Sequence, residues 1–334
     1  MELVYHDLRR MDEVKAFIEE WENDSDYILC ETSGSTGTPK QIALDKRMVK
    51  HSAERTIERF NLTAGMKAGL ALSTTTIAGK LMVVRALLAQ LELHVLPVTK
   101  NPLFGVKTCF DFIALVPTQA ISIIENNPDS TKLTTVLIGA APLTQSQHRK
   151  ISAACKNAYH TYGMTETASH VAVRKITEEN DTCYEALEGI TFETEDSCLV
   201  IYSADFKQGI KTNDCVALHS NTSFTYIGRN DFAMNVGGNK VHPEEIEYLL
   251  RTYITCEFIV VPFDDETYGQ GIGLMITGSF IPERLAMLDL PGLNTTNLPR
   301  KYLHRNELIY NANGKIDRLA MIEQSKQYAW KPIL

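Results

Sequence analysis

The feature that most constrains the fold is a regular alternation of short apolar runs and helical segments between residues 68 and 162. Runs such as Ala68–Leu72 and Thr135–Gly139 are predominantly apolar, which is typical of strands buried on both faces. The segments between such runs, Ile77–Gln90 and Gln145–Cys155 among them, have the apolar spacing of helices. Strands that alternate with helices are joined by crossovers, which parallel strands require. The sequence therefore predicts an α/β fold with a layered, mostly parallel sheet covered by helices.

The pattern changes in the last 150 or so residues. After about residue 183, short β segments such as Cys198–Tyr202 follow one another, which predicts a small antiparallel or barrel-like β subdomain. From Phe232 onward a small α+β pattern begins, with a helix at Pro243–Arg251 that has proline in its first turn. We therefore expect a large domain of residues 1–230 and a small C-terminal domain of residues 232–334.

Composition excludes several classes of protein. The chain has 334 residues, 44% of them hydrophobic and 22% charged, which is ordinary for a soluble globular protein. Its net charge of −8 argues against a broad nucleic-acid surface. The seven cysteines form no Cys-x-x-Cys pair, which indicates reduced thiols rather than a disulfide framework or a zinc site. The N-terminus lacks a signal-peptide pattern, and Lys80 and Arg85 interrupt the longest apolar stretch, so we expect a cytoplasmic protein without membrane insertion.

The segment Thr32–Lys40, Thr-Ser-Gly-Ser-Thr-Gly-Thr-Pro-Lys, follows the apolar run Tyr27–Cys30. Its glycines allow backbone N–H groups to approach phosphate oxygens, its hydroxyls donate further bonds, and its lysine supplies positive charge. It is not a Walker A loop, because Pro39 precedes the lysine and Gln41 follows it. The segment predicts a phosphate loop, with a mobile surface loop as the alternative.

A second motif, Tyr162-Gly-Met-Thr-Glu-Thr-Ala-Ser169, follows directly on a predicted strand. Ligands of α/β proteins bind at the carboxyl edge of the sheet, where this motif places a carboxylate and hydroxyls. A carboxylate beside a phosphate site is repulsive unless a cation lies between them, so Glu166 is a candidate Mg²⁺ ligand. The alternative for Glu166 is a solvated residue at the start of a helix.

Two further groups complete the set of candidates. Asp214 and Arg229 could grip ribose hydroxyls, because a carboxylate accepts and a guanidinium donates hydrogen bonds; a surface ion pair is the alternative. In Asn313-Gly-Lys-Ile-Asp-Arg318, a turn presents Lys315, and here the alternative is a lysine that only aids solubility.

Taken together and in this order, these segments resemble the adenylate-forming superfamily of acyl-CoA synthetases, luciferases and peptide-synthetase adenylation domains. The resemblance runs from about Tyr27 to the end of the chain. It implies that 1–230 is an AMP-binding domain and that 232–334 is a small mobile domain carrying the catalytic lysine. The residues that it implies for ATP or AMP binding are Thr32, Ser33, Gly34, Ser35, Thr36, Gly37, Lys40, Gly139, Ala140, Ala141, Tyr162, Gly163, Asp214 and Arg229.

The same resemblance implies roles for the remaining candidates. Lys315, Thr165 and Glu166 would be catalytic, with Glu166 as the magnesium ligand. Asp231 would be the hinge, and Gly237 and Gly238 would line the coenzyme A channel. The pocket for the acid would be formed by Thr75, Thr76 and Thr167.

Within the superfamily, the segments most similar to the o-succinylbenzoyl-CoA synthetases of menaquinone biosynthesis are Ala114–Gln119, Leu137–Pro142 and Gly237–Glu247. This subgroup implies an ATP- and Mg²⁺-dependent ligase that converts o-succinylbenzoate, through an acyl-adenylate, to its coenzyme A thioester. Two alternatives remain open. One is a stand-alone adenylation protein that loads a carrier-protein thiol, and the other is a catalytically silent nucleotide-binding homologue.

The sequence departs from the family pattern in three places. Only 31 residues precede the predicted phosphate loop, far fewer than in most relatives, so we expect a missing or reduced N-terminal subdomain. The sheet edge left uncovered is compatible with a homodimer. Gln41 replaces a glycine, and Thr76 stands where many relatives have a histidine or an aromatic residue.

For the second carboxylate of a diacid, the cationic candidates are His170, Lys80 and Arg85, each with a structural role as the alternative.

Overall fold

The computed structural model describes residues 1–31, 41–126, 133–178, 182–279, 285, 293, 297–310 and 316–333. The chain divides into two units, and each is described by itself. Unit 1 comprises Met1–Thr194, Val200–Lys211 and Leu218–Thr225, and unit 2 comprises Glu195–Leu199, Thr212–Ala217 and Tyr226–Leu334. The predicted division into residues 1–230 and 232–334 stays a prediction.

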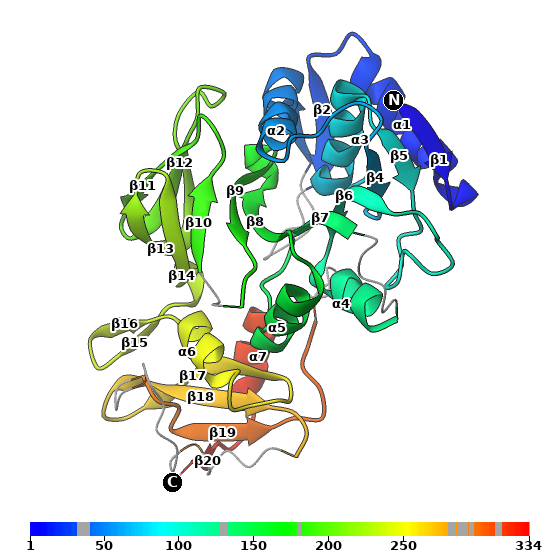
Figure 1. Cartoon of the computed structure of the whole chain (residues 1–334). Coiled ribbons are helices and arrows are strands. Elements are labelled where there is room, and N and C mark those ends of the chain that lie inside the picture. Colours follow the sequence, from blue (N-terminus) through cyan, green and yellow to red (C-terminus); the bar gives the residue numbers. More distant parts are fainter. Residues whose placement is uncertain are drawn as a thin grey trace. The chain divides into compact units, whose positions relative to one another are not determined.

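The elements follow the predicted alternation through the first half of the chain (Figure 1). The helices are α1 (Met11–Glu22), α2 (Lys46–Arg59), α3 (Ile77–Ala89), α4 (Pro117–Asn126), α5 (Gln145–Ala154), α6 (Pro243–Leu250) and α7 (Arg318–Ser325). The strands up to β10 are β1 (Glu2–Tyr5), β2 (Tyr27–Glu31), β3 (Gln41–Asp45), β4 (Lys67–Leu70), β5 (Glu92–Val95), β6 (Phe110–Leu115), β7 (Leu133–Ile138), β8 (Ala158–Met164), β9 (Ser169–Lys175) and β10 (Cys183–Ala186). The later strands are β11 (Thr191–Glu195), β12 (Cys198–Tyr202), β13 (Ile210–Ser220), β14 (Ser223–Arg229), β15 (Met234–Val236), β16 (Asn239–Val241), β17 (Phe258–Asp265), β18 (Gly269–Ile276), β19 (Lys301–His304) and β20 (Lys331–Pro332).

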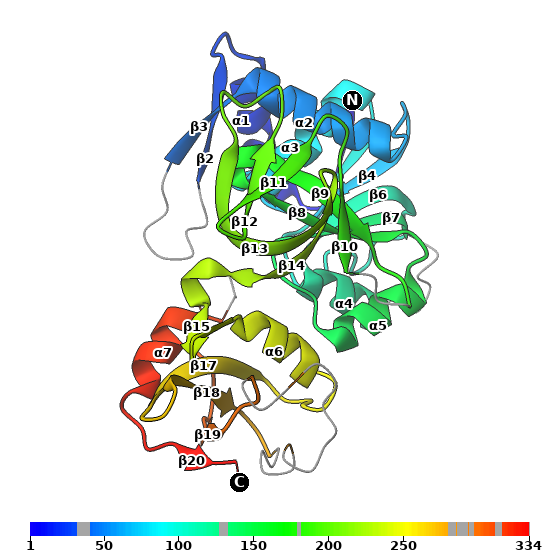
Figure 2. The ribbon, with the colours of Figure 1, turned by 90° about the vertical axis from the view of Figure 1, so that its left-hand side faces the viewer.

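Among the described residues, the largest sheet has twelve strands in the order β1-β5-β4-β6-β7-β8-β9-β10-β14-β13-β12-β11. Every pair from β1 to β8 along this order is parallel. From β8 onward the pairs β8–β9, β9–β10 and β10–β14 are antiparallel. The α/β prediction is therefore confirmed. The predicted β subdomain does not close on itself but continues the same hydrogen-bonded sheet (Figure 2).

Both faces of the parallel part are buried, which explains its apolar strands. On β6, Phe112 and Ala114 pack into the cluster formed with α1, α2 and α3. Ile113 and Leu115, which alternate with them, pack into the cluster formed with α4 and α5. Successive side chains of a strand point to opposite faces, so each face needs its own helical layer. The pairs α2–α3 and α4–α5 lie side by side in both views (Figure 1, Figure 2).

At one end of the large sheet, the edge strand is β1, which is formed by the first residues of the chain. β1 pairs in parallel with β5, from Glu2 opposite Glu92 to Tyr5 opposite Val95. The first residues of the chain thus form the edge of the sheet, followed by α1 on the same face as α2 and α3. The sequence analysis predicted no strand there, because a four-residue segment has too few positions to show a period.

Unit 2 contains a smaller sheet, in the order β16-β15-β18-β19-β20, with β17 paired to β18. Residues of α6 pack with Phe258 and Val260 on one face of β17. Met321 of α7 packs with Ile259 and Val261 on the other face. This is the small α+β pattern that the sequence predicts for the C-terminal part. No helix in the described ranges is both long and apolar enough to span a bilayer.

Candidate active site

The predicted phosphate-loop residues Thr32, Ser33, Gly34, Ser35, Thr36, Gly37 and Lys40, and also Lys315, lie outside the described residues. The residues that flank them are described. β2 and β3 form an antiparallel hairpin whose last pair is Glu31 with Gln41. Tyr310 and Ile316 pair as an isolated antiparallel bridge. Each of the two predicted functional segments is therefore bounded by paired residues.

The other predicted residues of unit 1 follow the carboxyl ends of parallel strands. Thr75 and Thr76 come after β4, Gly139–Ala141 come after β7, and Tyr162–Thr167 end β8 and form a short 3-10 helix. β4, β6, β7 and β8 are consecutive neighbours in the parallel part of the sheet. Their carboxyl ends meet at one edge, so the structure places these predicted residues at the edge where α/β proteins bind ligands.

Three non-glycine residues of these segments have left-handed backbone conformations. The φ angles are 71° at Ala140, 50° at Ala168 and 87° at Ser169. A residue with a Cβ atom adopts this region at an energetic cost, and such positions cluster at functional sites. Ala140 belongs to the predicted nucleotide turn, and the other two directly follow the Thr-Glu-Thr segment.

An aromatic cluster supports Tyr162. Its ring packs edge-on against Phe224 at 5.0 Å and against Tyr184 at 5.9 Å between centroids. The hydroxyl of Tyr184 lies 2.5 Å from Nδ1 of His160. This cluster gives the predicted adenine-binding side chain a fixed orientation, which favours stacking on a flat base.

His160 connects this cluster to the predicted nucleotide turn. Its Nε2 lies 2.9 Å from the carbonyl oxygen of Ala141. A carbonyl only accepts, so Nε2 donates and Nδ1 accepts from Tyr184. Burial, with Arg174 nearby, lowers the pKa of His160 to about 4, so the ring is neutral at neutral pH, as this arrangement requires. The sequence analysis missed His160; its only signal was a polar residue inside an apolar strand.

Glu166 has no hydrogen-bond or ion-pair partner among the described residues and is half-buried in the short helix Thr165–Thr167. In those residues no group of three or more acidic, histidine or cysteine side chains could hold a metal ion. Mg²⁺ commonly binds one or two carboxylates together with substrate phosphates and water, rather than an all-protein cage. Glu166 fits that type of site.

Thr167 has a different environment from the other two predicted pocket residues. It is buried, and its hydroxyl, which has one proton to donate, lies 2.7 Å from the carbonyl oxygen of Ser169 and 3.0 Å from that of Met164 and accepts from the N–H of Met164. These bonds shape the turn after β8. Thr75 and Thr76 are exposed, and Thr76 caps α3 by accepting from the N–H of Gly79 at 3.3 Å.

A cavity of about 190 Å³ lies between these elements in unit 1. Glu31 and Gln41, the residues that flank the predicted phosphate loop, line it together with Thr75 and Lys80. Lys80 is buried, and its Nζ lies 2.6 Å from a carboxylate oxygen of Glu20. Since that charge is already paired, Lys80 is a poor candidate for binding a second substrate carboxylate.

Arg85 differs from Lys80 because it has no acidic partner among the described residues. Its side chain is 2% exposed, and its Nε and Nη2 atoms have no hydrogen-bond partner there. Burial lowers the pKa of Arg85 to about 9, which still leaves it charged at neutral pH. Burial and the charge of Arg85 lower the pKa of His170 well below its usual value. Arg85 is therefore an uncompensated buried cation, an arrangement that favours an anionic ligand.

In unit 2 the predicted ribose-binding pair and the predicted hinge residue form one network. Nη1 of Arg229 lies 3.5 Å from Asp214, and its Nη2 lies 2.5 Å from Asp231. Burial alone would lower the pKa of Arg229, but the hydrogen bond that it donates to Asp231 and the charge of Asp214 raise it. The backbone N–H of Asp214 donates to Thr212 Oγ1 at 3.1 Å, which fixes the strand locally. Arg229 thus links the strand that carries Asp214 to the start of the small sheet.

Gly237 and Gly238 form the two-residue turn between β15 and β16. Their φ angles are 57° and 85°, the two positive values that a tight hairpin turn of this type requires. A Cβ atom at Gly237 would lie 2.9 Å from the ring of Tyr268. Glycine is therefore required here by the turn itself, and the predicted role of the turn in a coenzyme A channel stays a prediction.

Several known proteins are similar to this chain over most of its length. A family profile described as AMP-binding enzyme matches residues 5–193. The chain is 26% identical to a probable 2-succinylbenzoate–CoA ligase of Mycobacterium tuberculosis, covering 90% of this chain and 85% of that protein. It is 23% identical to a D-alanine–D-alanyl carrier protein ligase of Listeria innocua, covering 90% and 70%.

A solved structure is similar over nearly the whole length of both chains. It is an AMP-forming acyl-CoA synthetase/AMP-acid ligase II-like protein from Dyadobacter fermentans, with 32% identity, a TM-score of 0.63 and coverage of 93% of each chain. The profile match covers more than half of this chain. The chain therefore belongs to the family of AMP-binding enzymes and is an ATP-dependent, adenylate-forming ligase.

Proposed function

We propose that this protein is an acid–coenzyme A ligase whose acid carries a second carboxylate, with 2-succinylbenzoate as the substrate. In the first half-reaction, the acid's carboxylate attacks the α-phosphate of ATP, and pyrophosphate leaves. In the second, the thiol of coenzyme A attacks the acyl carbon of the adenylate, and AMP leaves. Activation is needed because hydroxide is a poor leaving group, whereas AMP is a good one.

The observation that carries the choice of acid is Arg85. A buried guanidinium with two unpaired nitrogens offers a carboxylate two parallel hydrogen bonds in a region of low dielectric. It disfavours the ammonium group of D-alanine, because like charges repel strongly when buried.

We assign the remaining roles by the chemistry of the residues. Residues 32–40 would hold the β- and γ-phosphates, Thr165 the α-phosphate, and Tyr162 with Gly139–Ala141 the adenine. Asp214 and Arg229 would hold the ribose. Glu166 would bind Mg²⁺, which neutralises phosphate charge during the transfer. Gly237 and Gly238 would line the path of the pantetheine arm.

A panel of acids tests this proposal. The purified chain is incubated with ATP, Mg²⁺ and 2-succinylbenzoate, benzoate or D-alanine, each with and without coenzyme A. We expect pyrophosphate exchange with 2-succinylbenzoate, and formation of the thioester with release of AMP only when coenzyme A is present. Exchange with D-alanine, and no thioester with coenzyme A, would favour the loading of a carrier protein instead. If none of a wider set of acids supported exchange, the chain would be a silent nucleotide-binding homologue.

The predicted hinge gives a separate test of the two half-reactions. We expect Asp231→Pro to slow thioester formation by about tenfold or more while adenylation changes much less, because proline fixes φ where the small domain would rotate. Asp231→Ala is the matched control, since it removes the same carboxylate from Arg229 without fixing the backbone. Equal losses in both half-reactions, or equal effects of the two variants, would contradict the hinge assignment. Single-turnover measurements of adenylate formation and of thioester formation separate the outcomes.

A further inference from the structure

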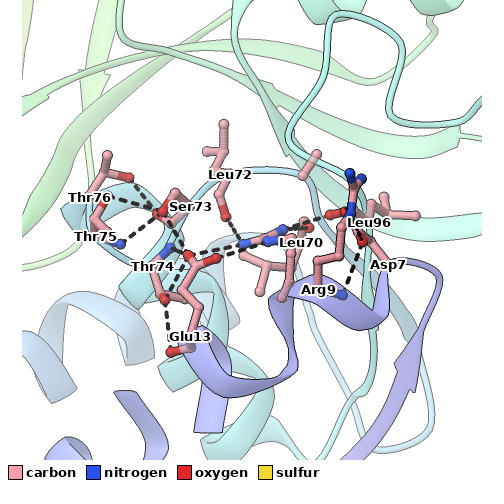
Figure 3. Close-up of polar contacts among 12 residues, drawn as sticks. Asp7, Arg9, Glu13, Leu70, Leu72, Ser73, Thr74, Thr75, Thr76 and Leu96 are labelled. Atoms are coloured by element: carbon pink, nitrogen blue, oxygen red, sulfur yellow. Dashed lines mark hydrogen bonds and ion pairs between the residues drawn. The ribbon is translucent and has the colours of Figure 1, made fainter. Parts of the chain in front are cut away.

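A polar cluster in unit 1 joins the N-terminal helix to the loop that carries Thr75 and Thr76 (Figure 3). Its first member is Arg10, which is 5% exposed. The guanidinium donates to the carbonyl oxygens of Leu70 at 2.9 Å, Leu96 at 2.7 Å and Leu72 at 2.7 Å. These carbonyls lie at or just beyond the ends of β4 and β5, and that of Leu70 also accepts from the N–H of Leu96 at 3.1 Å. Arg10 therefore anchors the start of α1 to the carboxyl edge of the sheet.

The second member, Glu13, binds the loop. Its Oε1 accepts from the hydroxyl of Ser73 at 2.7 Å, and from the N–H and hydroxyl of Thr74 at 2.5 and 3.0 Å. Its Oε2 accepts from Nε of Arg10 at 3.2 Å. Burial would raise the pKa of Glu13, but the hydrogen bonds from Arg10, Ser73 and Thr74 lower it to about 2. The carboxylate is thus ionised throughout the neutral range and, with a fifth and longer bond from Nη2 of Arg10 at 3.4 Å, accepts from five donors.

Ser73, whose hydroxyl binds Glu13, also makes hydrogen bonds to the next residues of the loop. The hydroxyl of Ser73 lies 3.0 Å from that of Thr75, and it accepts from the N–H of Thr75 at 3.2 Å. The carbonyl oxygen of Ser73 accepts from the hydroxyl of Thr76 at 2.9 Å. A Cβ atom at Gly79 would lie only 2.0 Å from that carbonyl oxygen, so the loop lies directly against the first turn of α3. A change at Glu13 therefore reaches both predicted pocket threonines.

The loop of residues 73–76 borders open space. Behind Ser73 lies a hollow of about 470 Å³, lined also by Arg10, Glu13, Val98 and Thr99. Thr75 lines the 190 Å³ cavity together with Glu31 and Gln41. Ser73 and Thr75 therefore each border an open space, and hydrogen bonds that lead to Glu13 orient their hydroxyls.

We propose that Glu13 is a positioning residue for the acid-binding pocket, acting through Ser73 on Thr75 and Thr76. This inference rests on the proposed function, since it assumes that these threonines face the acid. Glu13 sets the affinity for the acid and leaves the affinity for ATP unchanged, because its bonds go to the loop before α3 and to Arg10.

The test compares Glu13→Gln with Glu19→Gln, a matched charge change at an exposed position of the same helix. We expect Glu13→Gln to raise KM for 2-succinylbenzoate by about tenfold, because charge-assisted hydrogen bonds become neutral ones. We expect KM for ATP to change less than about twofold, and Glu19→Gln to change neither. Equal increases in both KM values, or a lowered Tm without a change in KM for the acid, would overturn the proposal.

Two further measurements keep the inference distinct from the proposed function. Ser73→Ala removes the hydroxyl through which Glu13 acts on Thr75. The double variant with Glu13→Gln should therefore raise KM for the acid no more than Glu13→Gln alone. Additive effects on this KM would contradict a pathway through Ser73. Hydrogen exchange needs no substrate: in Glu13→Gln the amides of residues 73–76 should exchange at least tenfold faster, with those of β6 unchanged. If no acid is adenylated by the wild-type protein, the proposed function fails, and with it the acid-binding role of Glu13. If amide hydrogen exchange at residues 73–76 is the same in Glu13→Gln as in the wild-type protein, Glu13 has no positioning role, even when the ligase activity is present.

Discussion

Lys315→Ala is expected to reduce acid-dependent exchange of pyrophosphate into ATP by about 10²–10³-fold. In our proposal this lysine stabilises the charge that develops between the attacking carboxylate and the α-phosphate. A positioned cation acts there in the transition state and is worth about 3–4 kcal/mol. The thioester half-reaction starts from an adenylate that is already made, so its rate from supplied acyl-adenylate should stay near that of the wild-type protein.

Lys326→Ala is the control for this experiment. Lys326 is an exposed lysine of the same unit that pairs with Glu323 at 2.7 Å, and its loss should leave both half-reactions unchanged, since exposed pairs contribute little. If Lys315→Ala exchanged pyrophosphate into ATP at the wild-type rate, the proposed catalytic role of Lys315 would be wrong. Equal loss of both half-reactions would instead indicate a general structural effect, which a lowered Tm would reveal.

Arg85→Met is expected to move activity and stability in opposite directions. Loss of the guanidinium removes two charge-assisted hydrogen bonds to the second carboxylate, so KM for 2-succinylbenzoate should rise by about 30- to 100-fold. Without ligand, the same change removes an uncompensated buried charge from the core. The free energy of unfolding should therefore increase by about 1–2 kcal/mol, measurable by urea denaturation.

Two controls make this result specific. Arg149→Met changes an exposed arginine of α5 and should alter neither quantity. Benzoate, which has no second carboxylate, should be used equally poorly by the wild-type protein and by Arg85→Met. If Arg85→Met destabilised the fold and left KM for the diacid unchanged, Arg85 would have a structural role, and the diacid assignment would lose its support.

The sequence predicted the elements of the α/β core closely because each carries its own period. The predicted helix Ile77–Gln90 is α3 at Ile77–Ala89, and the predicted strand Tyr27–Cys30 is β2 at Tyr27–Glu31. Buried parallel strands read as apolar runs, and helices on one face read as amphipathic segments. The strands β1, β9, β10, β15, β16, β19 and β20 were not predicted, since short or mixed segments become strands only when a partner strand is present.

The sequence also predicted the segments of the candidate site, because the predicted phosphate loop, the Thr-Glu-Thr turn, Asp214 and Arg229 each combine chemistry with a fixed spacing; their roles stay predictions. The sequence did not distinguish Lys80 from Arg85 as a candidate for binding a second carboxylate of the substrate. The structure separates them: Glu20 neutralises Lys80, whereas Arg85 has no carboxylate beside it among the described residues. That distinction depends on which helices pack together.

Only the tertiary structure identified the residues that support the site. Arg10 bonds carbonyls 60 and 86 residues away, and His160 joins the turn at Ala141 to Tyr184. The sequence by itself determined what is local: the period of each element and the chemistry of each loop. The tertiary structure decided which charges are paired and which hydroxyls are oriented, because those properties belong to contacts between segments far apart in the chain, which no local pattern encodes.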